Sequence, residues 1–110
     1  MTLTPATWHA TVARDMTEKE LLQAVRDITR FLRIHAYHTH DSRRSDPGFP
    51  DLVVVGTRVL YRELKTEKGR LRPAQVVWVN ALTHAGVDVG VWRPADLLDG
   101  TILDQLRAVA

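Results

Sequence analysis

Apolar residues recur at helical spacing after Thr17, where the first long helix is predicted. They lie three or four residues apart and therefore share one face of a helix. These positions are Leu21, Val25, Ile28 and Leu32. Thr17 suits the N-cap, and Glu20 follows it at the spacing of a capping box. Residues 1–16 show no clear period, so we expect an N-terminal arm there and a single domain over residues 17–110.

The middle of the chain alternates between β-rich runs and turn residues. A short strand is predicted around Tyr37, and the cluster of Ser, Asp, Pro and Gly between 40 and 50 predicts a loop. Leu52–Val55 and Val59–Lys65 then read as the two strands of a hairpin. The residues between them are Gly56, Thr57 and Arg58.

A second helix is predicted from Pro73, a favoured first helical residue, to just before Gly86, a favoured C-terminal stop. Its expected buried stripe consists of Val76 or Val77, Val79, Leu82 and Ala85, and Trp78 is expected in the core. Residues 87–92 predict a fourth strand, Pro94 a short helical turn, and residues 101–109 a last helix. The order α-β-β-β-α-β predicts a single α/β domain with a sheet flanked by helices.

Composition narrows the class of protein. The 110 residues are 45% hydrophobic and 25% charged, which is ordinary for one globular domain. There is no cysteine, so disulfides and thiolate metal sites are excluded. No apolar run approaches the roughly 20 residues of a membrane span, and no signal-peptide pattern precedes the first helix. We therefore expect a cytoplasmic protein.

The basic charge is concentrated around the hairpin. Residues 43–72 hold eight Lys or Arg and four acids, whereas the rest of the chain has a net charge of −2. Such a concentration is typical of a polyanion binder, and a solvated surface is the alternative. The residues expected to contact a phosphate backbone are His38, His40, Ser42, Arg43, Arg44, Lys68, Arg70 and Arg72. With no cysteine and no closed ligand set, zinc on the histidines is disfavoured.

The hairpin itself holds the candidate chemistry. A three-residue turn places Asp51 directly opposite Glu63, and alternation puts Lys65 on the same face. Two facing carboxylates repel unless a cation lies between them, and Mg²⁺ prefers carboxylate oxygens. A two-residue turn would instead place Asp51 opposite Arg62, in a surface ion pair worth about 0–1 kcal/mol. The hairpin alone leaves both alternatives open.

Two further side chains have a local and a functional interpretation. Glu20 could serve only as the partner of Thr17 in the capping box, or it could also reach a metal. Gln75, in the first turn of the second helix, could orient a water or a phosphate, or could be a solvated helix residue. Arg72 stands where Ser or Thr would be a better N-cap, so the start of this helix is expected to be irregular.

The order of these elements resembles a known family. A glutamate on the first helix is followed by "GFPD", "ELKTEKGRLRPAQVVW" and "VDVGVWRP". From Thr17 to Asp99 this order is similar to the VRR-NUC domain, a virus-type branch of the PD-(D/E)xK nuclease superfamily. The resemblance implies a restriction-endonuclease-like αβββαβ core with a central mixed sheet flanked by helices.

The resemblance also implies roles for individual residues. Asp51 and Glu63 match metal-binding acids, the carbonyl of Leu64 would complete the metal shell, and Lys65 matches the lysine that positions the attacking water. Glu20 matches the acid of the first helix, and Gln75 the glutamine of the following helix.

The implied function is a Mg²⁺- or Mn²⁺-dependent DNA endonuclease. Small stand-alone members are phage-like and resemble resolvases of branched DNA in repair and recombination, which implies a homodimer. Alternatives are a restriction-like duplex nuclease, a nickase, or a DNA-binding module that keeps the fold without activity. A domain this small could also depend on a separate targeting protein.

Overall fold

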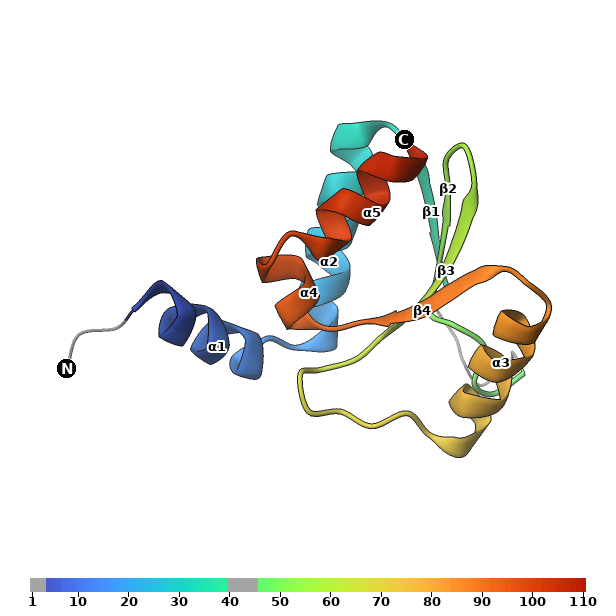
Figure 1. Cartoon of the computed structure of the whole chain (residues 1–110), viewed down its shortest axis with the longest axis horizontal. Helices are drawn as coiled ribbons and strands as arrows, with labels where there is room; N and C mark the ends of the chain where they lie inside the picture. The colour runs from blue at the N-terminus through green and yellow to red at the C-terminus, as the bar shows by residue number, and fades with distance from the viewer. Residues whose placement is uncertain (1–3, 40–45) are drawn as a thin grey trace.

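The computed structural model describes residues 4–39 and 46–110, and within them a four-stranded sheet has helices on both faces (Figure 1). The mixed α/β architecture predicted from the sequence is therefore confirmed. The elements are α1 (Pro5–Asp15), α2 (Glu18–Leu32), β1 (His35–His38), β2 (Leu52–Val55), β3 (Val59–Leu64), α3 (Pro73–His84), β4 (Asp88–Trp92), α4 (Pro94–Leu98) and α5 (Thr101–Val109).

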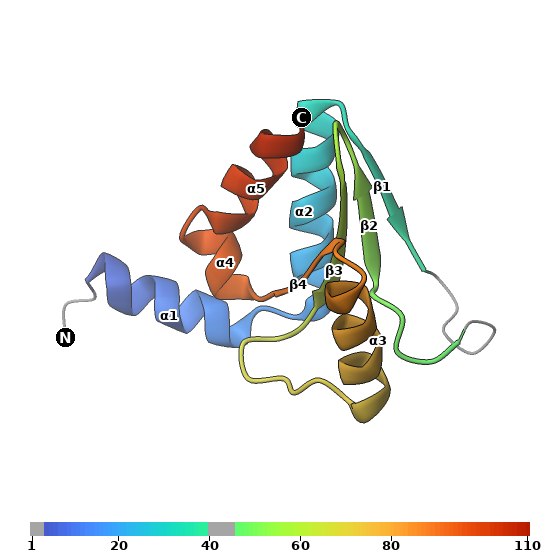
Figure 2. The ribbon, with the colours of Figure 1, turned by 45° about the vertical axis from the view of Figure 1, so that its right-hand side comes forward.

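The strands follow one another across the sheet in chain order. β1 pairs antiparallel with β2, and β2 antiparallel with β3, whereas β3 and β4 are parallel. Parallel neighbours need a crossover connection, and α3 supplies it. Figures 1 and 2 show α2, α4 and α5 on one face of the sheet and α3 on the other.

The two faces of the hairpin have different chemistry because side chains alternate along a strand. The core face carries Leu52, Val54, Leu60 and Leu64, which are buried against α2 and α5. The site face carries the odd-numbered residues, including Tyr61, Glu63 and Lys65, and lies toward α3. One face therefore supplies the hydrophobic core and the other is free for polar chemistry.

Local signals set the first long helix as predicted. The Thr17 hydroxyl accepts a hydrogen bond from the Glu20 N–H (3.1 Å), and the Glu20 carboxylate accepts one from the Thr17 N–H (3.1 Å). This capping box satisfies the N–H groups that a helix start leaves open. α2 ends at Leu32, and Arg33 adopts a left-handed conformation with φ of 58°.

The structure differs from the expectations drawn from the sequence at α1 and at α3. Residues 5–15 form the helix α1, although the sequence shows no clear period there, and α1 packs against α4. None of the α3 side chains is fully buried, because this helix covers only part of the site face (Figure 2). Trp78 is accordingly half-buried rather than a core residue.

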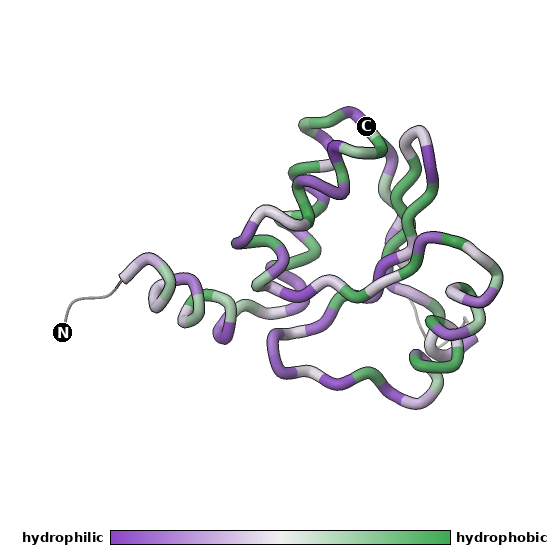
Figure 3. The backbone as a smooth tube through the Cα atoms, viewed as in Figure 1, coloured by the Kyte–Doolittle hydropathy of each residue, from purple (hydrophilic) through white to green (hydrophobic). Residues whose placement is uncertain are grey.

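The hydropathy of the residues differs between the hairpin and the loop that follows it. In Figure 3 the hairpin strands are largely green, whereas the loop between β3 and α3 is mostly purple, with basic residues along it. Among the described residues, no helix is both long and apolar enough to span a membrane.

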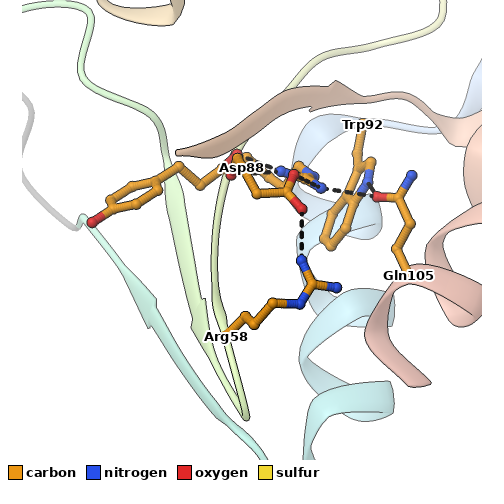
Figure 4. A network of polar contacts seen from close by, with 6 residues as sticks. Arg58, Asp88, Trp92 and Gln105 are labelled. Carbon is orange, nitrogen blue, oxygen red and sulfur yellow. Dashed lines mark hydrogen bonds and ion pairs between the residues drawn. The ribbon is translucent and has the colours of Figure 1, made fainter. Parts of the chain in front are cut away.

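On the core face, the buried guanidinium of Arg62 connects the sheet to α5 through a network of polar contacts (Figure 4). The Arg62 Nη2 group donates to the Asp88 carboxylate (2.8 Å) and to the Gln105 side-chain oxygen (3.2 Å). That oxygen also accepts from the Trp92 indole N–H (2.8 Å), and the Arg62 guanidinium lies 5.2 Å from the centroid of the Trp92 ring. The network fixes β3, β4 and α5 relative to one another.

Loss of the carboxylate in this network is expected to destabilise the fold. Asp88→Ala removes the anionic partner of Arg62, whose side chain is only 6% exposed, and should lower the free energy of unfolding by about 1.5–3 kcal/mol. Arg58→Ala removes the second cation on the same carboxylate, at 3.3 Å, but the Arg58 side chain is 57% exposed. This control should cost less than about 1 kcal/mol. Urea unfolding of both variants measures the difference, and equal losses would contradict the assignment.

Candidate active site

The hairpin turn has three residues, which decides between the two registers open from the sequence. Val55 pairs with Val59 and Leu52 with Arg62. Continuing the register by one pair places Asp51 opposite Glu63. The alternative, an ion pair between Asp51 and Arg62, is excluded, because Arg62 lies on the core face and binds Asp88.

Asp51 is held at the end of the hairpin by a backbone donor. Its Oδ2 atom accepts a hydrogen bond from the N–H of Leu64 (3.1 Å), and its carbonyl accepts one from the N–H of Thr39 (3.2 Å). These bonds tie the residue to β3 on one side and to the end of β1 on the other. The carboxylate therefore stays beside the last residues of β3.

Glu63 is a carboxylate in a buried position, with 2% of its surface exposed. Its Oε1 atom accepts a hydrogen bond from the Gln75 side-chain amide (2.9 Å). Its Oε2 atom is buried, and no N–H or O–H group of the described residues donates a hydrogen bond to it. Burial raises the pKa of Glu63 to about 9, reinforced by a side-chain hydrogen bond with Asp51 in the protonated form and by the negative charge of Asp51, and opposed by Lys65. A buried oxygen of this kind is an acceptor site that a cation would satisfy.

These acids line one cavity of about 290 Å³, here called the carboxylate pocket. Lys65 is a second buried ionisable residue on the same face. The lining side chains that matter for chemistry are Glu18, Asp51, Glu63, Lys65, Arg72 and Gln75. They come from α2, the hairpin, the loop after it and α3, so only the folded chain assembles them.

Gln75 is fixed at both ends of its amide. Its Oε1 atom accepts a hydrogen bond from the backbone N–H of Arg72 (2.8 Å), which directs its amino group toward Glu63. The same bond caps α3 and replaces the side-chain cap that Arg72 cannot provide. The irregular helix start expected from the sequence was therefore wrong, and α3 begins at Pro73.

Gly48 allows the loop before Asp51 to approach α3 closely. Its φ is +90°, and a Cβ atom there would lie 2.4 Å from the backbone of Ala74. Glycine is the residue that adopts this conformation without strain. The contact brings the loop against the first turn of α3, one residue from Gln75.

Arg93 holds the loop that follows Lys65, a role that sequence reasoning missed. Its Nη1 group donates to the carbonyls of Thr66 and Gly69 (both 2.7 Å) and of Glu67 (3.3 Å). The Glu67 carboxylate accepts in turn from the N–H of Ala95 (3.1 Å). The available signal was the "VWRP" segment. Because β3 and β4 are parallel and Leu64 pairs with Trp92, the residue after Trp92 lies beside the loop that follows β3.

The model of the VRR-NUC domain family matches residues 4–96. The chain belongs to the VRR-NUC family. A solved structure described as a VRR_NUC domain superposes with a TM-score of 0.66 at 20% identity, covering 78% of this chain and 94% of that one. Among curated proteins, none matches the chain.

Membership identifies the chain as a nuclease-type domain, for which DNA is the implied substrate. The resemblance stated from the sequence is confirmed, and the match also takes in α1, which the sequence resemblance did not include. The likeness in fold supports the restriction-endonuclease-like core.

The acid of α2 that lines the carboxylate pocket of this VRR-NUC domain is Glu18, whereas the acid predicted from the resemblance is Glu20. The Glu20 carboxylate is exposed and accepts hydrogen bonds from the N–H and the hydroxyl of Thr17, which lower the pKa of this acid. Glu18, two residues earlier, lines the carboxylate pocket. The sequence could not separate the two, because both acids lie in the first turn and only the packing angle of α2 selects one.

The predicted DNA contacts are distributed around the pocket. Arg72 lines it, Lys68 and Arg70 are exposed on the loop after Lys65, and His38 lines an adjoining cavity with Glu18, Lys19 and Asp51. Four predicted contacts lie outside the described residues. These are His40, Ser42, Arg43 and Arg44.

The donor set fits a divalent cation of the kind that nucleases of this family generally use. Within residues 4–39 and 46–110, no three His, Asp or Glu side chains form a ready metal cluster. Mg²⁺ does not require one, because it keeps several waters and is commonly held by one or two carboxylates. The unpartnered Oε2 atom of Glu63 beside Asp51 meets that need.

A side chain at position 48 is expected to disrupt the pocket. Gly48→Ala adds both the cost of a positive φ and a clash with the Ala74 backbone. Gly86→Ala is the matched control, because Gly86 has φ +85° but no atom within 4 Å of the added Cβ. The control should cost about 1–2 kcal/mol of unfolding free energy, and Gly48→Ala at least about 1 kcal/mol more. Equal losses in thermal or urea unfolding would show that the contact with α3 is unimportant.

The raised pKa of Glu63 predicts a pH-dependent stability in the metal-free protein. The folded state keeps Glu63 protonated up to about pH 9, whereas the unfolded chain ionises it near 4.5. Between these values unfolding releases a proton, so the free energy of unfolding should fall as pH rises. Glu63→Gln should flatten this slope, and Glu18→Gln should keep it. Urea titrations in EDTA at pH 5, 7 and 9 test this, and equal slopes in wild type and Glu63→Gln would refute it.

Proposed function

We propose that this VRR-NUC domain is a Mg²⁺- or Mn²⁺-dependent endonuclease that hydrolyses phosphodiester bonds in DNA, with selectivity for branched substrates. The observation that carries the proposal is the buried, unpartnered carboxylate oxygen of Glu63 beside Asp51 and Lys65 in one pocket. A fold that buries Glu63 and Lys65 beside the half-buried Asp51, away from its hydrophobic core, suits electrostatic chemistry better than stability.

Asp51, Glu63 and the carbonyl of Leu64 would hold the cation. When bound, such an ion polarises a phosphodiester and lowers the pKa of water, and one-ion and two-ion mechanisms are both compatible with this donor set. Gln75 orients the Glu63 carboxylate, because its amino group has no freedom to turn away while its oxygen caps α3. Gln75 is therefore a positioning residue in this scheme.

Lys65 would act on the attacking water or on the charge that develops at phosphorus. It is buried on the same face as Glu63, so its ammonium group is poorly screened by solvent. A fixed cation there stabilises a pentavalent phosphorane-like transition state more than the starting diester.

Glu18 is the acid of α2 that we favour as an additional carboxylate near the cation. It lines the carboxylate pocket, while Glu20 is committed to the helix cap. A role for Glu20 would require the capping box to open, which costs about 1 kcal/mol.

The basic residues around the pocket would hold the DNA backbone. Arg72 lies at the pocket, and Lys68 and Arg70 extend this positive surface along the loop that Arg93 clamps. His38 contributes from the neighbouring cavity. The predicted contributions of His40, Ser42, Arg43 and Arg44 complete the set of phosphate contacts.

A homodimer would place two such sites on two strands of a branched substrate. Two regions are candidates for the contact between copies, α5 and the segment around Trp8. α5 directs Ile102, Leu106 and Val109 into the core. Trp8, by contrast, is 51% exposed on α1, which extends away from the body (Figure 1). We therefore favour α1 for the contact between copies.

The main alternative functions share this fold and differ in what they do to DNA. A restriction-like enzyme would cut linear duplex, a nickase would cut one strand of a branch, and a non-catalytic module would bind DNA with salt dependence and without turnover. A separate targeting protein is compatible with each of these. The cytoplasm is the compartment we propose, as expected for a chain without cysteine.

Cleavage of a labelled four-way junction and of a matched linear duplex, in EDTA, Mg²⁺ and Mn²⁺, tests the proposal. We expect metal-dependent paired nicks on the junction. Lys65→Ala and Asp51→Asn should lower the rate by about a hundredfold or more, whereas Arg107→Ala, on the exposed side of α5, should not. Cutting of duplex alone would keep the chemistry and remove the selectivity. Binding without cleavage in either metal would favour the non-catalytic module.

A further inference from the structure

A second cavity adjoins the carboxylate pocket and has a different lining. It measures about 310 Å³ and shares Gly48, Phe49 and Asp51 with the first cavity. Its other walls are Tyr37 and Thr39 from the end of β1, Asp46 from the loop, and Trp78 from α3. A group bound at Asp51 therefore has this aromatic pocket as its direct neighbour.

The rings of the aromatic pocket are held in place from behind. Phe49 packs edge-on against Trp78, with centroids 5.1 Å apart and planes at 84°, and edge-on against Tyr61 at 6.1 Å and 88°. Tyr37 stands on the edge strand β1 and is 63% exposed, and its hydroxyl makes no hydrogen bond to the described residues. Two rings are thus fixed by packing, and a third is open for contact.

The charge of the lining selects against phosphate. The described lining has two carboxylates and no Lys or Arg. Asp51 would hold the cation of the proposed site, so Asp46 is the negative charge that stays uncompensated in this cavity. An anionic backbone would be repelled there, whereas a flat uncharged ring would gain contact with the aromatic side chains.

We propose that the aromatic pocket binds one unstacked nucleobase of the cleaved strand, next to the phosphate held at the carboxylate pocket. The inference rests on the proposed nuclease function and deepens it. Bases inside a duplex are stacked and cannot enter, and unstacking costs least where pairing is already interrupted. The pocket therefore favours strands at a branch point over continuous duplex. It supplies a physical origin for structure selection without base-specific readout.

Loss of one aromatic ring and loss of one base should have the same, non-additive effect. Binding is measured by fluorescence anisotropy in Ca²⁺, with a labelled four-way junction and a Lys65→Ala parent that does not cleave it. A single abasic residue is moved stepwise along the cleaved strand. One position should weaken binding about fivefold to a hundredfold, the range of a base–aromatic stack. Tyr37→Thr keeps strand propensity and should weaken binding of the intact junction by the same factor. The abasic residue at that position should then weaken binding by the variant no further.

Two control variants separate stacking from other effects. Tyr37→Phe keeps the ring and should keep the position-specific loss. Phe31→Ala removes an even more exposed aromatic residue, 82% exposed near the far end of α2, and should bind as the parent does. The proposal is overturned if Tyr37→Thr binds intact junction as tightly as the parent, or if the abasic losses are the same in both proteins.

Cleavage by the enzyme with Lys65 intact is scored separately in Mg²⁺. Cleavage without coupling between Tyr37 and one abasic position would refute the base pocket and support the nuclease function. Coupling without cleavage would refute the nuclease function and support the base pocket.

Discussion

Two carboxylates facing one another at the end of a hairpin are the constraint on which the arrangement of this domain depends. Asp51 and Glu63 are brought together by strand register, and Glu63 is withdrawn from water. Burial of a charge costs free energy unless it is paired, so the metal-free fold favours a protonated Glu63. A divalent cation would relieve the same cost. Stability and metal affinity are thereby linked through one side chain.

Several tethers from distant parts of the chain hold this pair in place. Gln75 fixes Glu63 from α3, the Gly48 contact brings the preceding loop onto the same helix, and Arg93 clamps the loop after Lys65. Each tether ends on a backbone group or on a side chain that is itself bound. Such double anchoring limits the freedom of the reactive groups, which electrostatic catalysis requires.

The sheet separates stability from chemistry by the alternation of its side chains. Arg62 and Glu63 are neighbours in sequence, yet Arg62 points to the core face, where Asp88, Gln105 and Trp92 satisfy it, and Glu63 points to the site face with one oxygen unpaired. α3 covers only part of the site face, which leaves both pockets open beside it. Because α3 covers the site face only in part, none of its side chains is fully buried, and a substrate can reach both pockets.

The sequence by itself determined most of the elements and the candidate acids of the hairpin. Helical spacing, the Thr17 capping box and Pro73 act over a few residues, so they can be recognised along the chain. The length of the hairpin turn, which sets Asp51 opposite Glu63, was decided by the pairing of the strands in the folded chain. Tertiary structure alone decided which acid of α2 lines the pocket and how Gln75 connects the Arg72 N–H to Glu63. It also decided that Arg93 binds the carbonyls of the loop after Lys65, and that the burial of α3 is incomplete. These features depend on packing angles and on contacts between residues far apart in the chain, and no local pattern of residues records them.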